Sequence, residues 1–197
     1  MNDVINCILE RRSIRKYKSE QITEAELDMI LQAGLYAPNA GSRQSAIVVA
    51  CQNKKINTEL GKINQSCFHG NMSTTMAYIS KEQPSIADDA ALKDGFYGAP
   101  TVLTLFTPKN FLYSIADCAV MGQNIMLAAH SLGIGSCMVM RADDTFSGEL
   151  GQKLQKARQT HERKVIYFFI RPWEGLKEWK RYYHFLRSWK TTGSNGK

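Results

Sequence analysis

The 197-residue sequence has no apolar run that approaches the roughly 18 residues of a membrane span. The acidic Asp3 stands where a secretory signal needs positive charge, so we expect neither export nor a membrane partner. The Gly-rich dinucleotide fingerprint, the P-loop, the His-Glu-x-x-His helix and the Gly-x-Ser-x-Gly elbow are also missing. These absences argue against the commonest nucleotide-binding, metalloprotease and serine-hydrolase sites.

Cysteine and histidine are few and scattered. The five cysteines form no Cys-x-x-Cys pair and the four histidines lack ligand spacing, so no metal site is predicted. Because the cysteines are odd in number and mostly surrounded by apolar residues, we expect reduced thiols and a cytoplasmic location. The net charge of +7 favours an anionic partner, whether nucleic acid, membrane phosphate or a phosphorylated small molecule.

The length and composition of the chain indicate one α+β domain. Hydrophobic residues make up 44% of the 197 positions, enough for one sizeable core and too little chain for two comfortable domains. We therefore predict a single domain over residues 1–190, followed by a frayed tail over residues 191–197.

Periodicity predicts helices and short buried strands in mixed order. Thr23 and Glu26 form a capping box ahead of a helix that must end before Pro38. Residues 114–132 are apolar on almost all sides, which predicts a core helix that ends at a left-handed Gly133. The other predicted elements are helices over 4–12, 55–66 and 144–158, helical pieces near 87–94, and strands over 46–51, 101–106 and 165–170.

A basic cluster directly after the first predicted helix is the first candidate for chemistry. Arg11 and Arg15 are four residues apart and would project together if the turn continues, and the Ser13 hydroxyl could bond the same anion. That arrangement suits a phosphate group. The alternative is an ordinary basic helix end, favoured by the helix dipole.

Two further segments could contact a ligand. In residues 38–44, small residues, an amide and a carboxamide could bring backbone close to a planar ligand, although such residues also make plain surface turns. Residues 133–137 read Gly-Ile-Gly-Ser-Cys, which taken alone is an ordinary helix C-cap.

Taken together, four ordered segments of the sequence resemble the FMN-dependent nitroreductase family. They are residues 11–17 (RRSIRKY), 33–44 (AGLYAPNAGSRQ), 97–103 (YGAPTVL) and 117–135, which contains Gln123-Asn124. The resemblance extends from the first helix to about Ile170. It implies an antiparallel-rich mixed sheet wrapped by helices, and an intertwined homodimer with each FMN in the subunit interface.

The resemblance also implies roles for the early basic cluster. Arg11, Arg12 and Ser13 would contact the phosphate and ribityl groups of FMN, and Arg15 would reach the pyrimidine edge of its ring. Reduced flavin carries negative charge near N1 and O2. A fixed guanidinium there would stabilise the reduced state and raise the reduction potential.

The loop after the second helix would serve the flavin of the other subunit. By resemblance, Pro38, Asn39 and Ala40 would come from the partner chain and cover the ring, while Gln44 would bind the flavin edge or ribityl. Asn39 replaces the serine that is usual in the family, and residues 45–46 are Ser-Ala where Pro-Trp is frequent. The floor of the substrate pocket therefore stays undefined by the sequence.

The later part of the chain supplies the remaining predicted contacts. Backbone groups around Met138, Met140 and Arg141 would face the reactive N5 side of the flavin. Arg181 resembles one of a late basic pair that returns to the phosphate. Residues from 173 onward otherwise fit the family pattern poorly.

The implied reaction is a ping-pong transfer of two electrons. NADH or NADPH would give hydride to flavin N5 and leave, and a nitroaromatic, quinone or similar small molecule would then be reduced on the same face. One open site serves both substrates, so no separate dinucleotide fold is needed and no catalytic side chain is named. The physiological acceptor, the NADH or NADPH preference and oxygen sensitivity stay open.

Two other functions are compatible with the residues. A flavin-binding protein without turnover would use the same contacts. A nucleic-acid-binding module is suggested by residues 179–190, where aromatic and basic side chains interleave. We expect no nucleic acid partner, because an arm that packs its aromatic residues on another subunit explains the same pattern.

Overall fold

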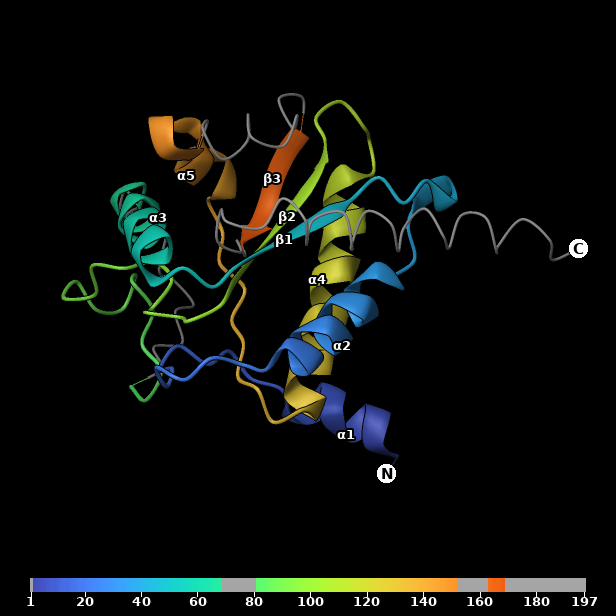
Figure 1. Cartoon of the computed structure of the whole chain (residues 1–197), viewed down its shortest axis with the longest axis horizontal. Helices are drawn as coiled ribbons and strands as arrows, with labels where there is room; N and C mark the ends of the chain where they lie inside the picture. The colour runs from blue at the N-terminus through green and yellow to red at the C-terminus, as the bar shows by residue number, and fades with distance from the viewer. Residues whose placement is uncertain (1, 69–80, 152–162, 169–197) are drawn as a thin grey trace, which may run out of the picture.

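The computed structural model describes residues 2–68, 81–151 and 163–168, the last of these as backbone only. The named elements are α1 (Asp3–Glu10), α2 (Glu24–Leu35), the 3-10 turn η1 (Ala40–Ser42), β1 (Ile47–Cys51), α3 (Lys54–Ser66), β2 (Val102–Pro108), α4 (Ser114–Ser131), α5 (Ala142–Ser147) and β3 (Arg163–Phe168) (Figure 1). Within these ranges, no helix combines the length and apolarity that crossing a membrane requires.

A small antiparallel sheet in the order β1-β2-β3 forms the centre of the described chain. Val49 pairs with Thr104 in the first ladder, and the second ladder has a register shift between Leu105 and Phe106. The parallel pairing seen among the described residues is an isolated bridge between Ser13 and Ser136. The predicted α+β class and antiparallel character are therefore confirmed, whereas the mixed sheet and the dimer stay predictions.

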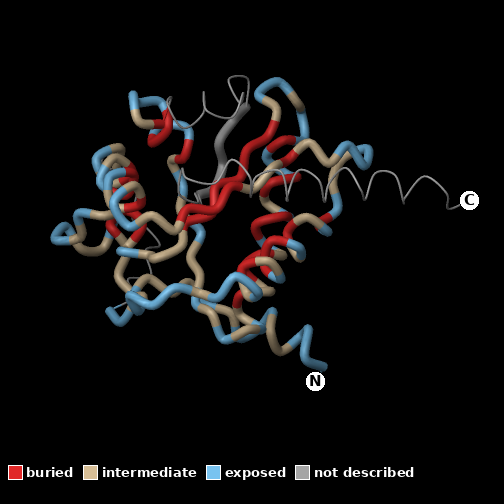
Figure 2. Tube along the Cα trace, in the orientation of Figure 1, coloured by how far each residue is buried: buried red, intermediate tan, exposed pale blue. Residues whose placement is uncertain are grey.

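Helices cover both faces of β2, and its residues are buried (Figures 1 and 2). Its side chains alternate between two hydrophobic clusters. Leu103 and Leu105 point to the α2–α4 cluster, and Val102 and Phe106 point to the α3–α5 cluster. The α2–α4 cluster includes Leu27, Ile30, Ile125 and Ala129, and the α3–α5 cluster includes Leu60, Phe96 and Phe146.

Close packing of α2 on α4 requires a glycine. A Cβ on Gly34 would lie 2.7 Å from Cγ1 of Ile125 and 2.9 Å from its Cδ1. The short side chain lets the two helices approach, and α4 is buried along much of its length as predicted.

Three sequence-based boundaries are corrected. The first helix ends at Glu10 instead of residue 12 because Arg11 is extended. No helix forms over 87–94, where Asp88 and Asp89 side chains bond nearby backbone N–H groups and make turns instead. The helix predicted over 144–158 begins earlier, in α5, and breaks at Gly148; residues 149–151 are helical, and its remainder lies outside the described residues.

Other predictions fall beyond the described ranges. These are the last part of the single domain, the end of the strand predicted over 165–170, the aromatic and basic segment 179–190, and the tail 191–197. Where the chain is described, β3 begins two residues before the predicted strand.

The capping box at the start of α2 is confirmed and supports a stability prediction. The Thr23 hydroxyl accepts from the Glu26 N–H, and Glu26 Oε2 accepts from the Thr23 N–H at 2.7 Å. We expect Thr23→Ala to lower the free energy of unfolding by about 1 kcal/mol in urea titrations. Hydrogen bonds from the Thr23 side chain and backbone lower the pKa of Glu26. The interaction should therefore be intact at neutral pH and lost as pH falls through that lowered pKa, which would shrink the difference between variant and parent.

Candidate functional site: a cationic cluster around Cys137

The segment after α1 is extended and fixed against the loop that follows α4. The backbone N–H of Ile14 donates to the carbonyl oxygen of Ser136 at 3.0 Å, within the bridge between Ser13 and Ser136. Gly135 permits this approach, because a Cβ there would lie 2.9 Å from Cγ2 of Ile14. The Gly-rich turn predicted as a simple helix end therefore also positions the basic segment.

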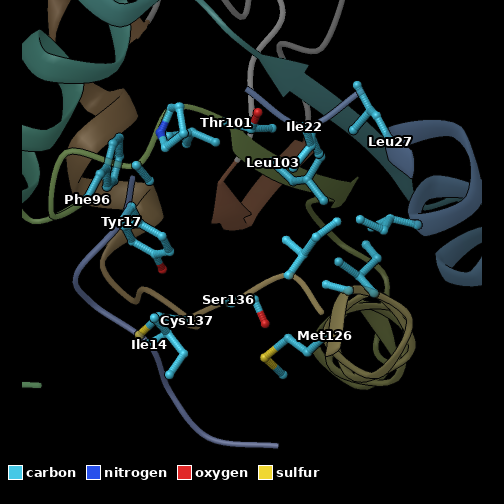
Figure 3. A pocket seen from close by; sticks show the side chains of 18 of the residues that line it. Ile14, Tyr17, Ile22, Leu27, Phe96, Thr101, Leu103, Met126, Ser136 and Cys137 are labelled. Carbon is cyan, nitrogen blue, oxygen red and sulfur yellow. The ribbon is translucent and has the colours of Figure 1, made fainter. Parts of the chain in front are cut away.

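Arg11, Ser13 and Arg15 converge on the thiol of Cys137. Burial raises the pKa of the Cys137 thiol, while the charge of Arg15, hydrogen bonds from Ser13 and Arg15, and the charge of Arg11 act in the opposite direction. Figure 3 shows Cys137 beside Ile14, where the two segments meet. The structure thus brings three of the predicted phosphate- and ring-binding residues together.

Arg11 carries an unsatisfied buried donor. Its Nη1 atom is buried and has no hydrogen-bond partner. A buried guanidinium nitrogen without a hydrogen-bond acceptor is costly, so this position favours an anionic ligand. The phosphate of FMN has the charge and the acceptor oxygens that fit it.

Arg15 is held by contacts that the sequence did not reveal. Its Nη1 donates to the carbonyl oxygen of Gln83 at 2.8 Å, and Oε1 of Gln83 accepts from the backbone N–H groups of Arg15 (2.6 Å) and Lys16 (3.1 Å). The guanidinium lies 6.0 Å from the ring centroid of Tyr97. Burial raises the pKa of Tyr97, against which its bond from the Ile86 N–H and the charges of Arg15 and Arg141 act. Because Gln83 holds both its backbone and its guanidinium, Arg15 is a preorganised cation.

Arg12 points back toward α1. Its Nη1 donates to the carbonyl oxygens of Leu9 at 2.6 Å and Arg11 at 2.9 Å, groups left without partners at the helix end. Its predicted contact with the flavin phosphate stays a prediction. Arg181, the other phosphate contact expected late in the chain, lies outside the described residues.

The loop with Met138, Met140 and Arg141 is fixed by a residue that sequence reasoning missed. Asn64 is fully buried in α3, and its Nδ2 donates to the Met140 carbonyl oxygen and to Thr145 Oγ1, both at 2.9 Å. Arg141 has the left-handed φ of 67° and donates from Nη2 to Asn64 Oδ1 at 3.1 Å. In the sequence, Asn64 looks like an ordinary polar residue of an amphipathic helix, so its hydrogen bonds to this loop could not be predicted.

The loop with Pro38, Asn39, Ala40 and Gln44 lies at the opposite end of α4 from the cationic cluster. Asn39 Oδ1 accepts from the Gln44 N–H at 2.8 Å, and Asp117 Oδ1 accepts from the Ala40 N–H at 3.0 Å. Asp117 is in the first turn of α4, whereas Cys137 follows its last turn (Figure 1). At about 1.5 Å of rise per residue, α4 from Asp117 onward is roughly 20 Å long. Within one subunit, this loop is therefore too far from the cluster of Arg11, Ser13 and Arg15 to share a ligand with it.

The sequence profile of the nitroreductase family matches residues 8–155, which include the cluster, the loop and the core helix between them. This chain belongs to the nitroreductase family. The resemblance inferred from the sequence is thereby confirmed, and the nitroreductase-like arrangement of helices around a small antiparallel sheet agrees with it.

Named relatives of this nitroreductase-family chain are flavin enzymes. It is 30% identical over 139 residues to the NADPH-flavin oxidoreductase of Vibrio harveyi and 25% identical over 143 residues to an FMN reductase (NADPH) of Bacillus subtilis. Each alignment covers 71% of this chain and 54% of the relative, so the chain spans about half the length of these relatives. The crystal structure of a nitroreductase with bound FMN from Bacteroides fragilis superposes with a TM-score of 0.68 at 26% identity, covering 89% of this chain and 92% of that one.

Proposed function

We propose that this nitroreductase-family chain is an FMN-dependent oxidoreductase that uses NADH or NADPH to reduce small electron-poor molecules. The observation that carries the proposal is the buried, unpartnered Nη1 of Arg11 within a cluster that also holds Ser13 and Arg15. Relatives named as NADPH-flavin oxidoreductase and FMN reductase, and a similar fold solved with bound FMN, support it.

Each part of the cluster has a distinct task. Arg11 and Ser13 would hold the FMN phosphate and ribityl through charge-assisted hydrogen bonds. Arg15, kept in place by Gln83, would put fixed positive charge beside the pyrimidine edge of the ring and favour its reduced state. The backbone of Met138, Met140 and Arg141 would face the reactive N5 side of the ring, supported by Asn64. FMN itself supplies the ability to accept hydride and pass two electrons onward.

We further propose that NAD(P)H and the acceptor use one open site in turn. A nitroaromatic or a quinone fits this chemistry because each accepts two electrons without needing a dedicated acid or base from the protein. The residues of this chain would therefore bind and orient, and none is assigned as a catalytic side chain.

We propose a homodimer as the working form. The apolar side chains Val4, Ile5, Ile8 and Leu9 leave α1 with an exposed hydrophobic face, which is typical of an interaction surface. The separation between the Arg11 cluster and residues 38–44 gives a second reason, because the loop of one subunit could cover the flavin of the other. Pro38, Asn39, Ala40 and Gln44 would then complete the site across the interface.

We propose a cytoplasmic location. All five cysteines are free thiols, which suits a reducing compartment. Burial raises the pKa of both Cys51 and Cys118 to about 12, so these two thiols are neutral and inert at physiological pH.

The test of this function is direct. Denaturing the purified protein should release one FMN per chain, and the folded protein should oxidise NADH or NADPH faster when a nitroaromatic or quinone is added. One FMN without turnover would identify a flavin-binding protein instead. A colourless, monomeric protein that ignores added FMN would refute the proposal.

A further inference from the structure

A large cavity lies between the two hydrophobic clusters, behind the segment that carries Arg15 (Figure 3). Its volume is about 540 Å³. Pockets for small molecules commonly measure about 300–1,000 Å³. Its walls come from the segment before α2, the start of β2, the second half of α4 and the loop after α4.

The cavity adjoins the proposed flavin site, because Cys137 and Met138 line it, but its lining leaves out the arginines of the cationic cluster. Ile14, Lys16 and Tyr17 line it, whereas Arg11, Ser13 and Arg15 do not. Arg11 and Arg15 therefore point away from the cavity, whereas Ile14, Lys16 and Tyr17 of the same extended segment form part of its wall. A ligand in this cavity would not occupy the proposed phosphate position.

The walls are mainly apolar and include aromatic and sulfur-containing side chains. Leu103, Ile125 and Phe96 are almost fully buried and line the cavity. Tyr17 and Met126 also line it, as Figure 3 shows. Rings pack favourably against such aromatic edges and thioethers. Engineered apolar cavities of about 150 Å³ bind benzene, so this larger and mainly apolar space has room for a bigger ring system.

One polar group in the lining lacks a partner. Oγ of Ser136 is buried without any hydrogen bond, and Figure 3 shows this oxygen toward Met126. A buried hydroxyl of this kind is stabilised by a ligand atom that can accept or donate a hydrogen bond.

Charge at the rim does not select an ion. The two positive charges of Lys16 and Lys18 are balanced by the negative charges of Glu20 and Glu26, and Glu26 also bonds Thr23 in the capping box. An uncharged ligand is therefore favoured over an anion or a cation.

We propose that this cavity binds an uncharged aromatic molecule that carries one hydrogen-bonding oxygen, contacted by Ser136. Arg11, Ser13 and Arg15 lie outside the lining, so the ligand leaves the proposed phosphate position free and binds together with FMN. Its occupant fills the space between the α2–α4 and α3–α5 clusters and stabilises the folded protein by mass action.

The test uses 2-naphthol, which is aromatic, uncharged at neutral pH and carries a single hydroxyl. Titrated by calorimetry into FMN-saturated protein, 2-naphthol should bind at one site per chain without releasing FMN, which is followed by its visible absorbance. Naphthalene, which lacks the oxygen, and 2-naphthalenesulfonate, which is charged, should each bind at least tenfold more weakly. Ser136→Ala should weaken 2-naphthol about tenfold and leave naphthalene unchanged, since about 1.4 kcal/mol corresponds to a factor of ten.

A cavity-filling variant provides the second arm. Ala129 is 3% exposed and lines the cavity, so Ala129→Phe should abolish 2-naphthol binding while flavin absorbance is retained. Ala116→Phe, at an exposed position of the same helix, is the matched control and should bind like the parent. Absence of 2-naphthol binding to the parent, displacement of FMN by 2-naphthol, or an equal affinity of parent and Ser136→Ala would each overturn the proposal.

Discussion

Arg11→Ala is expected to yield a protein that purifies without its yellow colour. The buried Nη1 of Arg11 has no partner within the described chain, so the phosphate would receive its strongest charge-assisted bonds from this guanidinium. Loss of such bonds, worth about 3 kcal/mol, should weaken FMN roughly hundredfold. Arg15→Ala should also lose FMN. The FMN dissociation constant, measured by fluorescence quenching of added FMN, checks both expectations.

Two variants serve as controls for this loss. Lys18→Ala removes the same unit of charge at an exposed position three residues from Arg15, and it should retain FMN. Arg12→Ala should have an intermediate effect, because its guanidinium already bonds the carbonyl oxygens of Leu9 and Arg11. If Arg11→Ala and Arg15→Ala remain fully yellow, the phosphate and ring assignments are wrong even though the family is not.

The part of the site that the sequence predicts is the part encoded locally. Arg11, Ser13 and Arg15 are close in the chain, and they lie together as predicted. The helical turn expected to align them does not continue, because the segment is extended and pairs with Ser136. The capping box of Thr23 and Glu26 is also local, and it forms as predicted. Local patterns therefore predict chemistry where neighbouring residues act together.

The supporting contacts are not local, and no pattern in the sequence points to them. Gln83 reaches Arg15 across 68 positions, and Asn64 reaches Met140 across 76. Both are polar residues whose type is ordinary for surface positions. Only the fold shows that Asn64 is buried and that Gln83 bonds the backbone of the basic segment.

The wrong boundaries have a similar origin. Residues 87–94 have helix-forming alanines, but Asp88 and Asp89 offer the backbone competing side-chain bonds that favour turns. In α5 the periodicity continues past Gly148, while the backbone there is extended with ψ of 174°. Propensity summed over a window does not reveal a single break of this kind.

Asn64→Ala is expected to lower both stability and FMN affinity. Removal of the amide leaves the Met140 carbonyl oxygen, the Thr145 hydroxyl and the Arg141 guanidinium without their buried partner. Buried groups stripped of a partner should cost about 2–3 kcal/mol, or roughly 5–10 °C in Tm. The loop of Met140 and Arg141 should loosen as well, and FMN should bind at least tenfold more weakly because its backbone contacts are no longer fixed.

Asn57→Ala separates a local effect from general destabilisation. Asn57 is 4% exposed on the same helix, and its Nδ2 donates to the carbonyl oxygens of Cys51 and Pro100 at 3.1 and 3.3 Å, away from the loop. This variant should lose a similar amount of stability in thermal unfolding and keep the parent FMN dissociation constant. Equal loss of FMN affinity in both variants would mean that Asn64 acts through overall stability alone. Retained affinity in Asn64→Ala would remove residues 138–141 from the flavin site.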